Sequence, residues 1–253
     1  MSATFDKRIA RARELAERRP AARDFLNFYV KLAQFQKPIF EELNLQDGTC
    51  VRDLIGYFPA FLEFVRSDGL DPLIDFANRH LGSVEAQEEL LLKSWDGGAG
   101  ALAESDEGAF FARVLLQPFA ESLANRCRMD FQPDKPICPF CNAKPVTAVL
   151  RSEGDGAKRW LLCSVCSTEW PFRRVVCPNC GQQDKDKLPI YSAAGLDYVR
   201  VEACDVCRTY IKSVDLTKDG LAIPVVDELA TVALNIWADE HGYAKLECNL
   251  LGF

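Results

Sequence analysis

Apolar side chains recur at spacings of three and four over the first 130 residues, which is the period of an amphipathic helix. The apolar stripe is broadest between Asp24 and Gln36, and this width predicts a helix that is buried along one side. We interpret the aromatic residues of the stripe as core packing rather than as the lining of a ligand pocket. The same pattern predicts helices over residues 4–19, 51–66, 83–95 and 107–128 and one that begins at Asp71, with breaks at residues 46–48 and 96–100.

The pattern changes after a proline-rich segment at residues 130–136. Short runs with β-branched and aromatic residues follow, and each pair of runs encloses a glycine-containing turn, which predicts two hairpins. Beyond these runs, apolar positions at spacings of three and four return over residues 226–237 and predict one more amphipathic helix. The expected strands are Val146–Leu150, Arg159–Leu162, Leu188–Ser192 and Tyr198–Glu202.

Eight of the eleven cysteines fall into four Cys-x-x-Cys pairs between residues 138 and 207. Two thiolates three residues apart on a tight turn can bind one metal ion together, and four thiolates complete a tetrahedral site. The four pairs therefore predict two metal sites in this segment. The candidate ligands are Cys138, Cys141, Cys163, Cys166, Cys177, Cys180, Cys204 and Cys207.

The cysteine-rich segment is an internal duplication. Its first two pairs precede its last two by 39 and 41 residues, and each half reads as pair, strand, turn, strand, pair. The first pair of each half is followed by Asn142 or Gly181, residue types that accept the positive φ that such a turn needs. A threonine, Thr168 or Thr209, follows each second pair. We therefore group the ligands sequentially, four per half, while an interleaved grouping of the same eight cysteines stays open.

This layout is typical of a zinc ribbon or a rubredoxin-like module. The expected fold class is a multi-part α+β protein, with an all-α N-terminal domain, two tandem rubredoxin-like or zinc-ribbon modules and a C-terminal helix. Each module has too few strands to be stable without its metal. Iron and zinc both accept four thiolates, so the pattern does not choose between them, and redox dithiols without metal are the alternative. The expected boundaries are 1–130 for the helical domain, 131–172 and 173–222 for the two modules, and 223–253 for the C-terminal helix and tail.

Composition and charge narrow the function classes. The formal net charge of −7 disfavours a general nucleic-acid-binding protein, which normally shows a basic surplus. No apolar run is long enough to span a bilayer, and the N-terminal residues lack the apolar core of a signal peptide. We therefore expect a cytoplasmic protein, in which such cysteine pairs bind metal or act as redox thiols.

No catalytic constellation is recognisable along the chain. There is no phosphate-binding glycine loop and no nucleophile motif of the form G-x-S-x-G. The two histidines, His80 and His241, lie outside any metal or nucleophile pattern. Cys50, Cys127 and Cys248 lack a partner at ligand spacing and are expected to be small apolar filler. We therefore expect that the chain is not an enzyme.

With these residues in view, the chain resembles the FdhE family of formate dehydrogenase accessory proteins. The resemblance is sharpest over residues 163–180, which read Cys-Ser-Val-Cys-Ser-Thr-Glu-Trp-Pro-Phe-Arg-Arg-Val-Val-Cys-Pro-Asn-Cys. It continues over residues 204–212, Cys-Asp-Val-Cys-Arg-Thr-Tyr-Ile-Lys, and ends in the segment 227–243.

The resemblance implies a cytoplasmic assembly factor that contacts the catalytic (alpha) subunit of a respiratory formate dehydrogenase before export. It also implies that the Cys-x-x-Cys motifs bind iron in a rubredoxin-like setting, so that the eight candidate cysteines become the ligands and part of the contact surface. Two competing hypotheses remain: an iron–thiolate electron-transfer or thiol-redox protein that acts on the client enzyme, and a zinc-ribbon nucleic-acid-binding protein. The identity of the client and self-association of the chain stay open.

Overall fold

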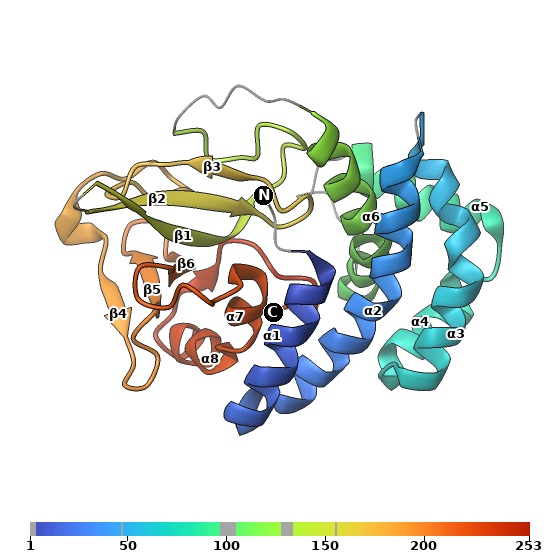
Figure 1. The fold of residues 1–253 in the computed structure, drawn as a ribbon, viewed down its shortest axis with the longest axis horizontal. Helices are drawn as coiled ribbons and strands as arrows, with labels where there is room; N and C mark the ends of the chain where they lie inside the picture. Colours follow the sequence, from blue (N-terminus) through green and yellow to red (C-terminus); the bar gives the residue numbers. More distant parts are fainter. Residues whose placement is uncertain (1–3, 47, 97–104, 128–133, 155) are drawn as a thin grey trace.

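The computed structural model describes residues 4–46, 48–96, 105–127, 134–154 and 156–253 (Figure 1). The predicted breaks at 46–48 and 96–100 and the proline-rich segment 130–136 lie partly outside these residues. The N-terminal part is helical, as predicted. Among the helices that the structure describes, none is long and apolar enough to cross a membrane. The helices of this part are α1 (Phe5–Arg18), α2 (Arg23–Leu45), α3 (Phe58–Asp68), α4 (Asp71–His80), α5 (Val84–Asp96) and α6 (Asp106–Arg126), with short 3₁₀ helices η1 (Pro20–Ala22) and η2 (Val51–Tyr57).

Two of these helices differ from their predicted extent, in both cases near a proline. Helix α2 continues through Pro38 to Leu45, because Ile39 and Leu43 extend its buried face and this burial outweighs the missing backbone hydrogen bond. The segment predicted as one helix over residues 51–66 begins as η2 and becomes α3 only at Phe58. Proline is tolerated in the first turn of α3 because its absent N–H would have no helical partner there.

Most aromatic residues of α2 pack in or against the core of the helical part, which confirms their interpretation as core. Phe25 is the exception, because it is 36% exposed and packs on Phe253. The ring of Phe35 lies 5.1 Å from that of Phe61, and Phe61 lies 5.2 Å from Phe111 of α6. Phe61 and Phe111 are fully buried. Such ring pairs add about 0.5–1.5 kcal/mol each beyond the area that they bury.

The C-terminal half is built on one mixed sheet, which lies beside the helices in Figure 1. The predicted hairpins are confirmed as the antiparallel pairs β1–β2 and β4–β5. Strands β3 and β6, which each follow a second cysteine pair, were not predicted. The order across the sheet is β3-β2-β1-β6-β5-β4, with β7 beside β6. The strands are β1 (Pro145–Glu153), β2 (Gly156–Cys163), β3 (Glu169–Pro171), β4 (Ile190–Ser192), β5 (Val199–Cys204), β6 (Thr209–Asp215) and β7 (Ala244–Lys245), with a short 3₁₀ helix η3 (Lys185–Lys187) before β4.

The two ribbon modules share this sheet. Strand β1 of the first module pairs in parallel with β6 of the second, with Thr147 opposite Lys212. The Thr147 hydroxyl also donates a hydrogen bond of 2.8 Å to the backbone carbonyl of Lys212. Both residues are fully buried, so the junction between the modules belongs to the interior of the protein.

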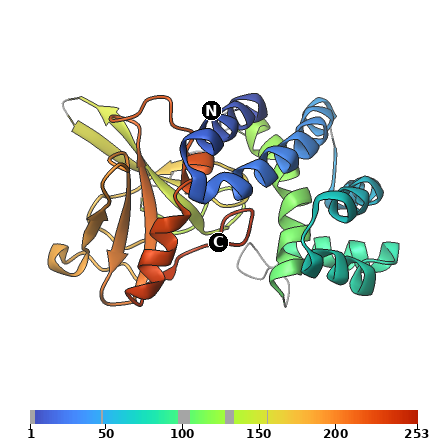
Figure 2. The same ribbon diagram turned by 90° about the horizontal axis from the view of Figure 1, so that it is seen from below.

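The predicted C-terminal helix is two helices, α7 (Pro224–Leu229) and α8 (Val232–Glu240). The break falls at Thr231, whose hydroxyl donates to the backbone carbonyls of Asp227 and Glu228 at 3.0 Å. A side chain that bonds the preceding turn in this way competes with the helical backbone and bends the chain. Helix α7 packs against β1, β6 and α1, and Figure 2 shows it between the sheet and the N-terminal helices.

A buried ionic cluster fixes α7 on the sheet. The Glu228 carboxylate lies 2.8 Å from the ammonium of Lys212 and 2.6 Å from that of Lys245, and it accepts a hydrogen bond of 2.8 Å from the Asn249 amide. Lys212 and Glu228 are fully buried. Burial opposes the charge on Glu228, but the two ammonium groups outweigh it and hold its pKa at about 2.

This cluster predicts a pH dependence of folding stability. The folded pKa of Glu228 is about 2 and its ordinary value is 4.5, so its contribution is complete above pH 4.5 and is lost as the pH falls towards 2. The expected loss is on the order of 3 kcal/mol over this range. Denaturant unfolding at a series of pH values from 6 to 2 measures it. The E228Q variant should be less stable at pH 6, and its free energy of unfolding should depend less on pH. An equally steep pH dependence in this variant would exclude Glu228 as the source of the effect.

Candidate metal centres

The first cysteine cluster joins the turn before β1 to the turn after β2. The sulfur atoms of Cys138, Cys141, Cys163 and Cys166 all lie within 4.8 Å of one another. Cys141 Sγ is 3.3 Å from Cys163 Sγ, and Cys138 Sγ is 3.5 Å from Cys166 Sγ. Cysteines 138, 163 and 166 are buried, and Cys141 is half-buried. The first cluster is therefore almost enclosed by protein.

The second cluster repeats this arrangement in the second module. Its four sulfur atoms also lie within 4.8 Å of one another. Cys177 Sγ is 3.6 Å from Cys207 Sγ, and Cys180 Sγ is 3.7 Å from Cys204 Sγ. Cys177 and Cys204 are buried, whereas Cys207 is half-buried and Cys180 is exposed. The second cluster therefore reaches the protein surface, and the sulfur atoms gather in the sequential grouping rather than the interleaved one.

The turns that carry the first pair of each module have the same backbone geometry. The residue after each pair has positive φ, 59° at Asn142 and 75° at Gly181, as their residue types predicted. In both turns the amide of the first cysteine donates across the turn, Cys138 to Ala143 and Cys177 to Gln182, each at 2.8 Å. This closure holds the two sulfur atoms of a pair on the same side of the turn.

The turns that carry the second pairs match in a way that residue type alone did not predict. The residues after these pairs, Ser167 and Arg208, also have positive φ, 52° and 56°. The threonine that follows places its hydroxyl beside the last sulfur of the pair, at 3.1 Å between Thr168 and Cys166 and at 3.0 Å between Thr209 and Cys207. Each hydroxyl therefore adds a polar partner to the last sulfur of its pair.

The four thiols of each cluster affect one another's ionisation. In the first cluster, hydrogen bonding with Cys141 and its neighbours lowers the pKa of Cys138, while burial raises the pKa of Cys163. In the second, burial raises the pKa of Cys177 to about 12. Burial also disfavours the Cys207 thiolate, but hydrogen bonds, with Thr209 first, bring its pKa down to about 6. Four thiols this close ionise together only when a cation balances them, and metal binding releases their protons.

The donor set fits a tetrahedral thiolate-bound metal ion. Four sulfurs at about 2.3 Å from one ion stand about 3.8 Å apart, and the closest sulfur pairs are 3.3–3.7 Å apart. All donors are soft thiolates, which suit zinc and iron rather than magnesium or calcium. Each cluster could therefore hold one such ion. The geometry is the same for both metals and does not distinguish them.

The first cluster is fastened to the helical part by a buried ion pair. The Arg8 guanidinium of α1 binds the Glu121 carboxylate of α6 at 2.9 and 3.0 Å. Glu121 also accepts a hydrogen bond of 2.7 Å from the Ser167 hydroxyl, next to Cys166. All three side chains are buried. Sequence reasoning missed this link, because charged residues on helices are usually solvated and nothing in the spacing joins residues 8, 121 and 167.

The remaining cysteines and the histidines lie outside both clusters. Cys50 and Cys127 are exposed and Cys248 is half-buried, so their interpretation as apolar filler is wrong for the first two. The imidazole of His80 packs on Phe76, and that of His241 stacks on Trp237. Among the described residues, groups of three or more potential metal-binding side chains occur only in the two cysteine clusters.

Comparisons of this chain with known proteins all match the same family. Residues 137–174 match the family model "FdhE, central domain", and residues 175–251 match "FdhE, C-terminal domain". A protein named FdhE homolog from Aquifex aeolicus is 31% identical over 94% of this chain and 92% of its own length. Protein FdhE of Escherichia coli strain HS is 28% identical over 97% of this chain and 86% of its own length.

The fold has been observed in a solved structure as well. The crystal structure of the FdhE protein from Pseudomonas aeruginosa superposes with a TM-score of 0.75 and covers 98% of this chain and 95% of that one, at 22% identity. This protein has a helical part, one shared sheet and two four-cysteine clusters. Together these features define a metal-binding protein of the zinc-ribbon-like class. Within that class, the chain belongs to the FdhE family.

Proposed function

We propose that this protein is a cytoplasmic, non-enzymatic accessory factor that binds the catalytic subunit of a respiratory formate dehydrogenase and supports its maturation. The observation that carries the proposal is FdhE family membership over nearly the whole chain. The two four-cysteine clusters on one sheet support it, since they provide a rigid platform with one cluster at the surface.

The eight clustered cysteines are the proposed metal ligands, four for each ion in sequential order. A bound zinc or iron ion would cross-link the two turns of a module, and iron would also supply a one-electron redox couple. Other residues of the chain position these ligands. The positive-φ turns orient the sulfur atoms, and Thr168 and Thr209 form hydrogen bonds with the last sulfur of each second pair. The hydrogen bonds of Glu121 hold the first cluster against the helices. The proposed boundaries are a helical domain at 1–130, modules at 131–172 and 173–222, and a C-terminal part at 223–253.

Deletion and co-purification in the native host test this function. We expect the tagged chain to co-purify with the formate dehydrogenase catalytic subunit, and we expect a deletion strain to lose most of its respiratory formate dehydrogenase activity. Expression of the chain from a plasmid should restore the activity. Wild-type activity in the deletion strain would refute the proposed role, whatever the binding result.

The exposure of Cys180 favours a second candidate function, an iron–thiolate redox protein that acts on the same client. An exposed ligand shortens the path for an electron between the second cluster and a docked partner. Protein purified without oxygen from the native host would then contain iron with thiolate charge-transfer absorption and would undergo reversible reduction. Redox-silent zinc in both clusters would exclude this candidate and leave the accessory role in place.

A further inference from the structure

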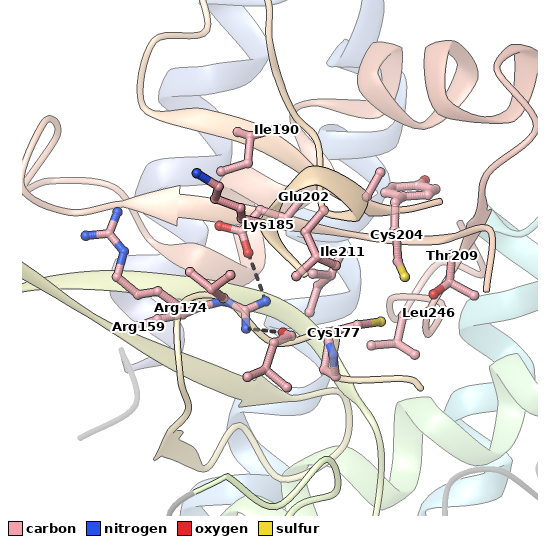
Figure 3. A pocket seen from close by; sticks show the side chains of 16 residues that line it. Arg159, Arg174, Cys177, Lys185, Ile190, Glu202, Cys204, Thr209, Ile211 and Leu246 are labelled. Carbon is pink, nitrogen blue, oxygen red and sulfur yellow. Dashed lines mark hydrogen bonds and ion pairs between the residues drawn. The ribbon is translucent and has the colours of Figure 1, made fainter. Parts of the chain in front are cut away.

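A recess of about 220 Å³ lies between the two modules and next to the second cluster (Figure 3). It is on the face of β5 and β6 where Glu202 pairs with Ile211. Strand residues alternate between faces, so this face is opposite the one that packs against α8 through Val199 and Val201. Cys177 and Cys204 of the second cluster form part of its wall.

The interior of the recess is apolar, and its buried charge is already neutralised. Val176, Ile211 and Leu246 supply buried apolar surface. The guanidinium of Arg159, 2% exposed, lies 2.8 Å from the Glu202 carboxylate and donates to the backbone carbonyl of Val176 at 3.3 Å. Because the Arg159 guanidinium already has a carboxylate partner, a small anion is disfavoured as the occupant of the recess.

The rim is basic and exposes apolar side chains. Arg174 and Lys185 line the opening and are both exposed, and Lys185 forms no ion pair within the part of the chain that the structure describes. Val175 and Ile190 at the same opening are 49% and 55% exposed. A basic rim stands out on a chain whose net charge is −7. It would attract acidic groups to this place and repel basic ones.

We propose that this recess binds an apolar side chain of a partner polypeptide, flanked in the partner's sequence by carboxylates. The volume is below the roughly 300–1,000 Å³ of most small-molecule sites and suits one large side chain, which is how interface anchors bind. Strand β4, whose Ile190 lines the recess, is an edge strand paired on one side with β5. An extended peptide can lie along such an edge. The identity of the partner, the formate dehydrogenase catalytic subunit, rests on the proposed function.

A peptide assay on the full-length, metal-loaded protein tests the recess itself. The probe is a fluorescein-labelled, end-capped peptide, Gly-Ser-Asp-Asp-Leu-Asp-Asp-Ser-Gly, and its counterparts carry lysines for the aspartates or alanine for the leucine. We expect the leucine–aspartate peptide to bind at least about tenfold more tightly than either counterpart, as measured by fluorescence anisotropy. Equal affinities for the three peptides would overturn the proposal.

Two charge-reversal variants locate the binding. The double variant R174E/K185E should lower the affinity for the leucine–aspartate peptide at least about tenfold. The control K7E/R13E changes the net charge equally at exposed positions of α1 and should change it less than about twofold. Metal content and thermal unfolding verify that both variants are folded. Equal losses in the two variants would overturn the assignment to this recess.

Binding of the purified catalytic subunit separates this inference from the proposed function. If the subunit binds and R174E/K185E weakens the complex, both stand. If the subunit binds equally well to R174E/K185E, the recess proposal fails and the proposed function stands. If the subunit does not bind but the acidic peptide does, the proposed function fails and the recess stands. If the chain self-associates and R174E/K185E abolishes this self-association, the recess binds a second copy of the chain and the proposal is overturned.

Discussion

The substitution C163S is expected to remove one metal ion per chain and to destabilise the whole protein by about 4 kcal/mol or more. Oxygen replaces a soft sulfur donor in a site that needs four thiolates. Cys163 is 1% exposed and belongs to the core cluster that includes Ala120 of α6 and Trp170. Loss of the first metal should therefore disturb the helical interface as well as the module. Elemental analysis gives the metal content, and thermal unfolding followed by circular dichroism gives the stability.

The matched control is C180S, which changes the exposed cysteine of the second cluster. It should also leave one metal per chain, but with a smaller loss of stability, because Cys180 is not part of a buried core cluster among the described residues. Two metals per chain after either substitution would show that the ligand assignment is wrong. Equal destabilisation would show that the two clusters do not differ in their coupling to the core.

The second large effect is expected from E121Q, which removes the carboxylate charge that binds the buried Arg8 guanidinium. Removing one partner of a buried ion pair costs about 3–5 kcal/mol, and Arg8 and Glu121 are 1% and 4% exposed. Chemical denaturation measures this loss. Because the Ser167 hydroxyl is bonded to the same carboxylate, we also expect faster metal loss from the first cluster in the presence of a chelator.

The control for this prediction is E89Q, the same change in a surface pair. Glu89 binds Lys93 one helical turn away, and their side chains are 63% and 70% exposed. Surface pairs contribute about 0–1 kcal/mol, so E89Q should have little effect. Replacing both partners of the buried pair, as in R8M/E121L, should recover part of the loss, because apolar residues remove the buried cation as well as its partner. A loss from E121Q as small as that from E89Q would contradict the structural role of the pair.

Local patterns in the sequence predicted most of the elements. The apolar stripe from Phe25 to Phe35 predicted the long second helix. Asn142 and Gly181, which follow the first cysteine pair of each module, predicted turns with positive φ, and the structure confirms them. These features depend on residues close together in the chain. The helix after Pro38 was missed because its continuation depends on the burial of Ile39 and Leu43 by other elements, and no local pattern reports that.

The interactions that join distant parts of the chain were beyond such reasoning. Lys212 lies in β6, a strand that the sequence did not predict, and it is fully buried against Glu228. The parallel pairing of β1 with β6 joins residues about 65 positions apart, and a tandem arrangement of separate modules fits the sequence equally well. The recess exists only because this pairing brings Arg159 of one module to Glu202 of the other.

The shared sheet also bears on how the protein avoids polymerisation. Its two halves, β3-β2-β1 and β6-β5-β4, have their equivalent strands in the same order across the sheet. The central pair therefore joins the first strand of one module, β1, to the third strand of the other, β6. The two edge strands are again a first strand, β4, and a third strand, β3. The same pairing between β4 of one molecule and β3 of the next would build an open-ended, head-to-tail filament. Each is three residues long, β3 ends in Pro171, and Pro189 precedes β4. Short, proline-bounded edges limit such growth, so the sheet ends with the two modules of one chain.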